Sequence, residues 1–357
     1  MPDVITSAGE VTPQWLTETL RRNGFLDSGS VESVSLNESR TLTVSIISHL
    51  EIEYSRDAPS IAPKRLFLKI SNPEFQPGGA REYLPNEFKF YNVVSGLMPD
   101  PPLPRCFDAA FSEKAGSTHL LLEDLSETHY HPPPPLPPSL AECEGSVDCL
   151  ARIHAYWWEH TQLGLSVGKL LSEPAVEQIA RASADTFNRF ADFLGDRLSG
   201  SRRKIFDKVI ATFPRPWVRL TQAKGLTLTH GDAHSWNFLY PRESQNGRVY
   251  LFDWQTWHVH IGPRDLAYMI TLFWYPERRA RMEQTLLKRY HQGLLSNGVS
   301  NYTWDDCWKD YRWSAIRNLF IPVTQWSRGI AVWLWWSQLE KALLAFEDLN
   351  CMELIES

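Results

Sequence analysis

Residues 230–253 constrain the fold of this chain more than any other stretch. They read HGDAHSWNFLYPRESQNGRVYLFD, in which an Asn-Gly pair stands between the apolar runs FLY and VYLF. Asn-Gly is the pair that tight β-hairpins favour. If the two runs pair antiparallel, the chain folds back on itself, and Asn237 and Asp253 lie at the same open end of the hairpin.

Asp232 precedes this open end, so the sequence predicts that two carboxylates and one amide converge there. Oxygen ligands of this kind suit Mg²⁺ rather than Zn²⁺. Mg²⁺ takes few ligands from a protein and completes its shell with water and substrate phosphates. The set therefore indicates a magnesium-dependent reaction of a phosphate donor, and we expect that donor to be ATP.

The N-terminal third of the chain is rich in predicted strands. Alternating apolar and polar residues are typical of half-buried strands, and a short continuous apolar run is typical of a buried one. These patterns predict strands at 31–36, 43–55, 65–70 and 117–125. We expect them to form a small antiparallel sheet.

Two helices are predicted in the same region. Residues 12–22 begin with Thr-Pro, a helix-starting pair, and residues 86–97 carry apolar residues at helical spacing. The apolar residues of the second helix are Phe90, Val93, Val94 and Leu97. A Ser139–Glu142 capping box then opens a mainly helical remainder, so the expected fold class is α+β.

Size and composition limit the partners of the chain. Its 357 residues exceed the roughly 250 at which a single core stops growing, so two lobes are expected. A net charge of −6 without a long basic run argues against nucleic acid. The lack of an apolar run of about 18 residues argues against a membrane span. Five cysteines without a C-x-x-C pair, together with an N-terminus unlike a signal peptide, favour a cytoplasmic protein.

The pattern around Asp232 matches a known catalytic loop. Kinases carry H-x-D-x-x-x-x-N, which His230, Asp232 and Asn237 fit, and Asp253 fits the metal-binding aspartate that follows. The chain resembles the aminoglycoside phosphotransferase and choline kinase-like superfamily of small-molecule kinases, and HGDAHSWNFLY and LFDWQ are similar to its ecdysteroid-kinase-like branch. The segments RLFLKI, NEFKFYNVV, LLLEDL, LARIHA and GPRDLAYMI follow the family's order.

This resemblance implies a bilobal protein-kinase-like fold. Residues 1–125 would form the N-terminal nucleotide-binding lobe, with a hinge at about 120–126. Residues 127–357 would form a larger helical lobe that holds the catalytic loop, the metal site and the acceptor pocket. The implied activity is transfer of the γ-phosphate of ATP to a hydroxyl group of a small molecule.

The resemblance also implies a role for each matching residue. Asp232 would be the catalytic base, and Asn237 and Asp253 would bind Mg²⁺. Lys69 would contact the α- and β-phosphates, with Glu87 on the following helix as its partner. Apart from the resemblance, a lysine at the end of a strand and a glutamate on a helix are commonly surface residues.

Further residues are implied to hold the nucleotide and the catalytic loop. Backbone groups near Glu123 and Leu125 would bind adenine, because LLLEDL resembles the hinge between lobes. His230 would support the catalytic loop, and Asp265 would fix the backbone of that loop. Asp265 also stands where a carboxylate stabilises the N-terminus of a helix, and both roles are compatible.

One departure from the family pattern leaves an alternative open. Kinases cover the phosphates with a glycine-rich turn, yet residues 37–45, NESRTLTVS, contain no glycine. The hydroxyls of Ser39, Thr41 or Thr43 would have to assist there, because backbone without glycine approaches a ligand less closely. The alternative is a nucleotide-binding pseudokinase, against which the intact catalytic set argues.

The histidines suggest a second alternative, a metallohydrolase. H-x-D-x-H at 230–234 and H-x-H at 258–260 are both spacings that metal ligands use. Neither motif has a further carboxylate or cysteine that the sequence places beside it. This alternative also leaves Lys69, Glu87 and the LLLEDL segment without a role.

The acceptor is predicted from the tryptophan-rich C-terminal half. Trp257, His258 and His260 follow Asp253 closely and are the candidates to border the acceptor site. Polycationic aminoglycosides would need clustered carboxylates, and the obvious tight pair, Asp305 and Asp306, is equally a helix cap. We therefore expect a small, fairly apolar hydroxylated metabolite, with choline-type or aminoglycoside acceptors as alternatives.

Overall fold

The computed structural model describes residues 4–74, 84–134, 136–243 and 247–356. The chain forms two compact units. The first consists of Met1–Tyr130 and Leu239–Thr256, and the second of His131–Phe238 and Trp257–Ser357. The lobe boundary expected at 125–127 stays a prediction.

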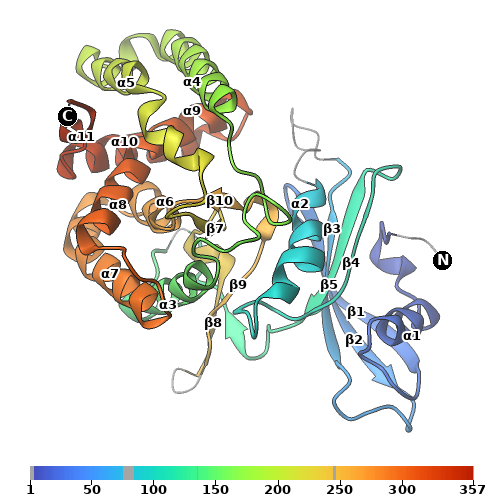
Figure 1. Ribbon diagram of the computed structural model, residues 1–357. Coiled ribbons are helices and arrows are strands. Elements are labelled where there is room, and N and C mark those ends of the chain that lie inside the picture. The colour runs from blue at the N-terminus through green and yellow to red at the C-terminus, as the bar shows by residue number, and fades with distance from the viewer. Residues whose placement is uncertain (1–3, 75–83, 135, 244–246, 357) are drawn as a thin grey trace. The chain divides into compact units, whose positions relative to one another are not determined.

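A five-stranded sheet forms the centre of the first unit (Figure 1). Its order is β1-β2-β3-β5-β4, and every neighbouring pair is antiparallel. The strands are β1 (Val31–Thr41), β2 (Ser45–Tyr54), β3 (Arg65–Ser71), β4 (Cys106–Ser112) and β5 (Ser117–Glu123). The antiparallel sheet is the predicted one, with β4 as an addition.

One face of this sheet is covered by α1 (Pro13–Arg22), which Thr12 caps by accepting a hydrogen bond from the Trp15 backbone N–H. Leu66, Leu68 and Ile70 of β3 are buried in the core beneath the helix. Because side chains alternate along a strand, Lys69 lies on the opposite face of β3. The alternation thus places an ammonium group away from the apolar core.

The predicted second helix is regular only at its start. It is α2 (Leu84–Lys89), which widens into a π-helical turn at Phe90–Val94 and ends in a 3-10 turn. Each residue of a π-helical turn advances around the helix axis by a smaller angle than in an α-helix. The residues after the turn therefore face a different side than a regular helix would give them. Val93 and Leu97 are therefore exposed, contrary to the prediction, and Tyr91 is buried instead.

A second, three-stranded sheet joins β6 (His129–Tyr130), β8 (Phe238–Pro241) and β9 (Tyr250–Leu251) in the order β6-β8-β9. The predicted pairing of FLY with VYLF is present, but the connection is longer than a two-residue turn. Its residues 244–246 lie outside the described residues. Gly247 is required for another reason: a Cβ atom there would collide with Pro241.

The second unit is mainly helical (Figure 1). Its helices are α3 (Leu140–Tyr156), α4 (Glu173–Leu194), α5 (Gly200–Thr212), α6 (Pro263–Phe273), α7 (Pro276–Ser296), α8 (Trp304–Asn318), α9 (Phe320–Ser327), α10 (Val332–Asp348) and α11 (Met352–Glu356). The two-stranded pair β7 (Thr227–Thr229) and β10 (His258–His260) lies among them. Helix α6 contacts α7, α8 and α10, and the predicted capping box of α3 is present.

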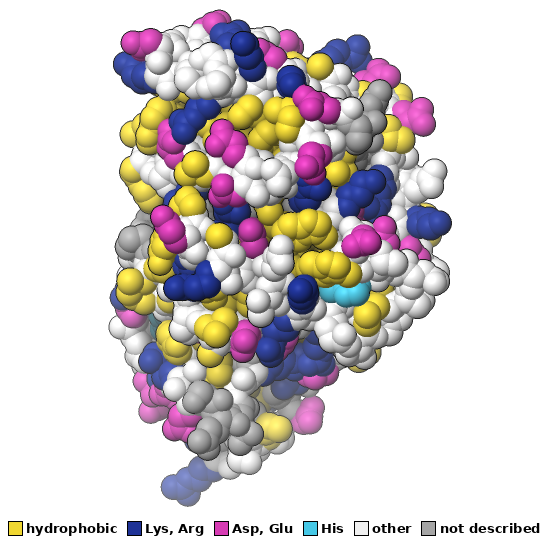
Figure 2. Space-filling view, turned by 90° about the vertical axis from the view of Figure 1, so that its left-hand side faces the viewer, with side chains coloured by type: hydrophobic (Ala, Val, Ile, Leu, Met, Phe, Trp, Pro, Cys, Tyr) yellow, Lys and Arg dark blue, Asp and Glu magenta, His cyan; other side chains and the backbone are white. Residues whose placement is uncertain are grey.

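Three general properties bear on the expected partners. No described helix combines the length and apolarity that a membrane crossing requires. The five cysteines form no disulfide. Acidic and basic side chains are interspersed with apolar ones on the face drawn in Figure 2.

Candidate active site

The first unit contains a buried cluster of one ammonium and two carboxylates. Lys69 Nζ donates to Glu87 Oε2 and to Asp253 Oδ1, each at 2.7 Å. Lys69 and Glu87 are 9% and 4% exposed, whereas the Asp253 side chain is 30% exposed. The interpretation of Lys69 and Glu87 as solvent-facing surface residues is therefore wrong.

Glu87 also fixes the segment that follows β9. Its Oε1 accepts a hydrogen bond from the backbone N–H of Trp254 at 3.2 Å, and the Trp254 ring stacks at 4.0 Å on Phe90, the first residue of the π-helical turn after α2. Asp253 has a φ of 67°, a conformation that is uncommon for a residue other than glycine. The Lys69 ammonium and these α2 contacts hold the Asp253 carboxylate in place.

The electrostatics of the cluster keep Lys69 charged. Burial alone lowers the pKa of Lys69, but the Asp253 and Glu87 carboxylates outweigh burial and raise it above the ordinary value. Burial raises the pKa of Glu87, because Lys69 only partly compensates for desolvation and for the nearby Asp253. One cation shared by two carboxylates is therefore a fixed positive charge, as a phosphate-binding lysine must be.

The turn between β1 and β2 is held without glycine. Asn72, just after β3, donates from Nδ2 to the carbonyls of Leu42 and Thr43 at 3.0 and 3.2 Å. None of the turn's residues has a positive φ, so the backbone does not require glycine there. The hydroxyl of Ser39 lies 3.1 Å from that of Ser48 and is already engaged in a hydrogen bond.

The predicted hinge, at about 120–126, spans the C-terminal part of β5 and the segment that follows it. Glu123 donates its backbone N–H to the Arg105 carbonyl at 2.8 Å, and the Leu125 carbonyl accepts from the His129 backbone N–H at 2.8 Å. Between them, the Asp124 carboxylate lies 2.8 Å from His49 of β2 and accepts from the backbone of Ser126. These contacts fix the hinge segment to the sheet, and adenine binding at Glu123 and Leu125 stays a prediction.

The catalytic-loop residues lie in the second unit around Asp265. This fully buried carboxylate accepts the backbone N–H of His230 at 2.7 Å and that of Gly231 at 2.9 Å. His154 Nε2 lies 3.3 Å from it, and burial would raise the pKa of Asp265, but these contacts lower it. Gly231 has a φ of 85°, which explains glycine at this position.

Asp232 directly follows this anchored backbone. Its Oδ1 accepts a hydrogen bond from the Tyr268 hydroxyl at 2.6 Å, and His234 Nε2 lies 3.5 Å from Oδ2. Burial would raise the pKa of Asp232, but the nearby His234 and the Tyr268 hydroxyl lower it overall. The carboxylate is thus kept ionised and about one-third exposed, as a proton acceptor must be.

Asn237 is hydrogen-bonded to the backbone of Asp232. Its Nδ2 donates to the Asp232 carbonyl at 2.9 Å, so the amide oxygen is the atom that remains to coordinate a cation. Asn237 belongs to the second unit and Asp253 to the first. Each presents an oxygen ligand suited to Mg²⁺, and their joint role stays a prediction.

Tyr268 and His154 support the catalytic loop but were not among the residues predicted from the sequence. Tyr268 stands three residues after Asp265 on α6, a spacing that places both on one helical face. His154 Nδ1 lies 2.8 Å from the Tyr290 hydroxyl, and a Cβ atom at Gly262 would meet both side chains. The glycine of GPRDLAYMI and the histidine of LARIHA are therefore the sequence features from which this close packing could have been predicted.

A sequence model of the ecdysteroid kinase-like family matches residues 81–298, more than half of the chain. The chain belongs to this family. The match includes Glu87, the catalytic loop and Asp265, so the resemblance to the ecdysteroid-kinase-like branch is confirmed. No curated protein sequence matches the chain.

Solved structures confirm the kinase-like fold of this ecdysteroid kinase-like chain. A putative aminoglycoside phosphotransferase from Ralstonia eutropha has a TM-score of 0.57 at 16% identity, covering 94% of this chain and 98% of its own. A microcompartment-associated aminopropanol kinase has a TM-score of 0.53 at 9% identity, covering 94% and 96%. An amicoumacin kinase with bound AMP-PNP and Ca²⁺ has a TM-score of 0.50 at 13% identity, covering 93% and 92%.

The candidate acceptor residues of this family member lie on and before β10. Trp257 and His258 are half-buried, whereas His260 is 2% exposed and lines a cavity of about 440 Å³ with Trp217 and Trp313. Burial and the nearby Arg317 lower the pKa of His260 well below its ordinary value. Asp232 is not among the residues lining that cavity, so contact of all three candidates with the acceptor stays a prediction.

The histidines do not assemble a metal cage in the described part of this ecdysteroid kinase-like chain. No group of three or more His, Cys, Asp or Glu side chains there is arranged to hold a metal ion. His260 instead accepts the Ile261 backbone N–H on Nδ1 at 2.8 Å and has Arg317 beside Nε2. Both ring nitrogens of His260 therefore have partners within the protein.

The environment of Asp232 predicts how the activity depends on pH. His234 and Tyr268 lower the pKa of Asp232, so the carboxylate should stay ionised down to a pH below the ordinary aspartate pKa of about 3.9. If Asp232 is the base, kcat/KM should therefore fall only below that pH. Tyr268→Phe removes one stabilising hydrogen bond and should move the acid limb of kcat/KM to higher pH. Profiles of both proteins between about pH 3 and 8 test this, and coincident acid limbs would contradict it.

Proposed function

We propose that this chain is an ATP-dependent kinase that transfers a phosphoryl group to a hydroxyl group of a small molecule. The observation that carries the proposal is the environment of Asp232. Its carboxylate is ionised, partly exposed and directed by Tyr268, on a loop fixed by Asp265. A carboxylate held in this way can accept the proton of an attacking hydroxyl group.

Other residues of the chain would bind the nucleotide phosphates and the metal ion. Lys69 would bind the phosphates of the nucleotide, and its charge is secured by Glu87. Asn237 and Asp253 would hold Mg²⁺, which neutralises charge on the phosphates when it is bound. Phosphoryl transfer needs little covalent help from the protein, so positioning and electrostatics of this kind would supply the catalysis.

An aromatic cluster beside Asp232 supports an acceptor with an apolar face. The His234 ring lies 5.0 Å from that of Trp236 and 5.3 Å from that of Phe273, and Trp236 and Phe273 lie 5.6 Å apart. His234 Nε2 lies 3.5 Å from Oδ2 of the proposed base, Asp232. Trp236 Nε1 has no hydrogen-bond partner among the described residues and could donate to the acceptor.

The aminoglycoside alternative finds less support. Asp306 Oδ2 accepts hydrogen bonds from the backbone and hydroxyl groups of Thr303 at 3.1 and 2.7 Å, which caps α8. The carboxylate is thus engaged at a helix end rather than presented to a polycation. Choline-type acceptors remain an alternative, because aromatic rings also bind quaternary ammonium groups.

A panel of acceptors tests the proposal. Purified protein is incubated with ATP and Mg²⁺ against sterol-like alcohols, amino alcohols including choline, sugars and aminoglycosides, and products are detected by the added mass of one phosphoryl group. For the acceptor used, Trp236→Ala should raise KM about tenfold without changing KM for ATP. Trp333→Ala, at a 71% exposed side chain, is the matched control. Retained ATP binding without transfer to any acceptor would favour the pseudokinase alternative.

A further inference from the structure

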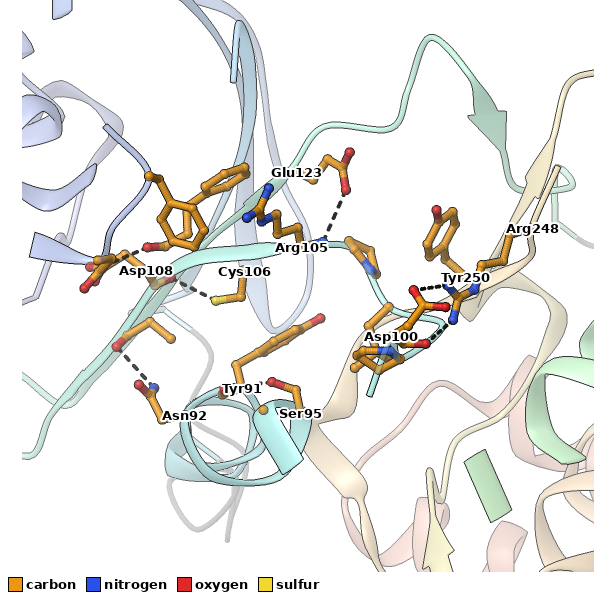
Figure 3. A pocket seen from close by; sticks show the side chains of 18 residues that line it. Tyr91, Asn92, Ser95, Asp100, Arg105, Cys106, Asp108, Glu123, Arg248 and Tyr250 are labelled. Carbon is orange, nitrogen blue, oxygen red and sulfur yellow. Dashed lines mark hydrogen bonds and ion pairs between the residues drawn. The ribbon is translucent and has the colours of Figure 1, made fainter. Parts of the chain in front are cut away.

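The first unit contains a cavity of about 550 Å³ that none of Lys69, Glu87 and Asp253 lines. Figure 3 shows it between the end of α2, the segment from Asp100 to Arg105 and the start of β4. Small-molecule sites in proteins commonly have volumes of about 300–1,000 Å³, so this cavity is large enough for a ligand. The cavity is therefore separate from the Lys69–Glu87–Asp253 cluster, and Glu123, whose backbone is predicted to bind adenine, is one of its lining residues.

Two buried hydrogen-bond donors line this cavity without a partner among the described residues. One is the hydroxyl of Tyr91, whose side chain is only 7% exposed. The other is Nε of Arg248, whose remaining nitrogens bind Asp100. A buried polar group without a partner costs about 1–3 kcal/mol, so each of these groups would be stabilised by an acceptor from a ligand.

The position of Tyr91 follows from the π-helical turn at the end of α2. A regular helix would bury the face of Val93 and Leu97, but the wider turn directs Tyr91 inward. In Figure 3 the Tyr91 ring extends towards the segment between Asp100 and Arg105. π-helical turns are frequent at functional sites, which is consistent with a binding role.

The walls of the cavity favour a flat aromatic ligand. Tyr91, Tyr250, Pro101 and Pro104 line it together with Leu103. Aromatic rings and prolines present flat apolar surfaces against which a planar ring packs well. The ligand would therefore combine a planar ring with at least one hydrogen-bond acceptor.

The charges around the cavity favour an uncharged ligand. The lining carboxylates, Asp100, Asp108 and Glu123, outnumber the two guanidinium groups and would repel an anion. These carboxylates do not require a cationic ligand either, because each already accepts a hydrogen bond within the protein. Asp100 accepts from Arg248, Asp108 from Asn23 and Glu123 from the Arg105 backbone.

The second guanidinium group lies apart from the unpartnered hydroxyl. Arg105 packs over the ring of Phe25 at 4.8 Å, and Figure 3 shows its side chain on the side of β4 away from Tyr91. A carbonyl or similar neutral acceptor on the ligand therefore matches the available donors better than a carboxylate does.

We infer that this cavity is a binding site for a small, flat, uncharged aromatic molecule that carries a carbonyl-type acceptor. The Tyr91 hydroxyl and Arg248 Nε, which have no partner among the described residues, are the donors available to such a ligand. Tyr91 lies one helical turn after Glu87 on the same helical segment, so the site can respond to, or influence, the position of the Lys69–Glu87 pair. The inference does not depend on the proposed kinase activity.

The test uses benzamide as the probe, with the full chain in parallel titrations without ATP and with an excess of ATP and Mg²⁺. Benzamide should bind one site with a Kd of about 1 mM or tighter by ligand-observed NMR titration. Benzoate, which adds a negative charge, and cyclohexanecarboxamide, which lacks the planar ring, should bind at least about fivefold more weakly. Equal affinity for all three compounds would overturn the assignment of the ligand class.

Two variants test the location of the site. Tyr91→Phe removes only the hydroxyl and should weaken benzamide binding about fivefold. Gly96→Trp should abolish the binding, because Gly96 lines the cavity and has open space where its Cβ would stand. Unchanged benzamide binding in both variants, or no saturable binding to the unmodified chain, would overturn the proposal.

The stability of the same variants provides a second readout. Tyr91→Phe should raise Tm by about 2–4 °C in the absence of ligand, because it removes a buried hydroxyl that has no partner. Tyr54→Phe is the matched control, since the Tyr54 hydroxyl donates to the Pro63 carbonyl at 2.8 Å, and its Tm should fall. If Tm falls for both variants, the Tyr91 hydroxyl is satisfied within the protein and the proposal fails.

Discussion

Asp232→Asn is expected to lower kcat/KM for phosphoryl transfer by about 10²–10⁴-fold, because general-base catalysis contributes an effect of this size. The substitution keeps the shape of the side chain and an oxygen for the Tyr268 hydroxyl, so the fold should be retained. Binding of ATP should be nearly unchanged, since the phosphate-binding residues are untouched. The measurement is steady-state kinetics together with an ATP titration of the same preparation.

A matched control separates the role of Asp232 from a general effect of charge. Asp305 is an exposed aspartate at the start of α8, and Asp305→Asn removes the same charge from the surface. Its kcat/KM should match that of the unmodified chain. A transfer rate in Asp232→Asn within about threefold of this control would rule out Asp232 as the base.

Lys69→Met is expected to affect both stability and activity. Removing one partner of a buried charge cluster typically destabilises a protein by about 3–5 kcal/mol, because the remaining charge is left without compensation. Here the Glu87 carboxylate, 4% exposed, would lose the Lys69 ammonium. The phosphates that Lys69 is proposed to bind would lose the same cation. Urea unfolding and the KM for ATP measure the two effects.

A double variant distinguishes these effects. Lys69→Met with Glu87→Gln removes the uncompensated charge at Glu87 and should recover part of the lost stability, but it should not recover activity. Lys64→Met is the control, because Lys64 is exposed one residue before β3. If the double variant regains full activity, Lys69 does not act on the nucleotide.

The sequence predicted the elements whose local pattern agrees with their packing. The strands at β1, β2, β3 and β5 follow apolar alternation or a buried run, and Thr12 caps α1 through a local hydrogen bond. The catalytic loop was recognisable because its residue spacing is set by local chemistry. The Asp265 contacts then show why the motif segments occur together, since this carboxylate binds the backbone of the loop.

The features that the sequence did not predict depend on tertiary contacts. β4 carries Asp108 and two alanines, which are poor strand formers, and a register shift after Cys106 breaks its alternation. The π-helical turn changes the buried face of α2 without a signal in apolar spacing. Glu87 could be identified only through the resemblance to the family, because nothing in the neighbouring sequence indicates that this glutamate is buried.

His234 gains a partial explanation from its surroundings. Sequence reasoning offered only metal binding for it, but its ring packs between Trp236 and Phe273, and Nε2 lies 3.5 Å from Asp232. It lowers the pKa of the base and belongs to the aromatic cluster proposed to meet the acceptor. The two histidines of THGDAHSWN thus differ in their contacts, because His230 Nδ1 accepts the Asp232 backbone N–H and His234 lies beside the Asp232 carboxylate.

The most direct test of the central claim is phosphorus NMR of a reaction that contains the protein, ATP, Mg²⁺ and an acceptor found in the panel. We expect the γ-phosphate signal of ATP to decline while the ADP and phosphomonoester signals rise in equal amounts. The Asp232→Asn protein should show neither change on the same timescale. Conversion of ATP to inorganic phosphate without a phosphomonoester would contradict the account, as would an equal rate in the Asp232→Asn protein.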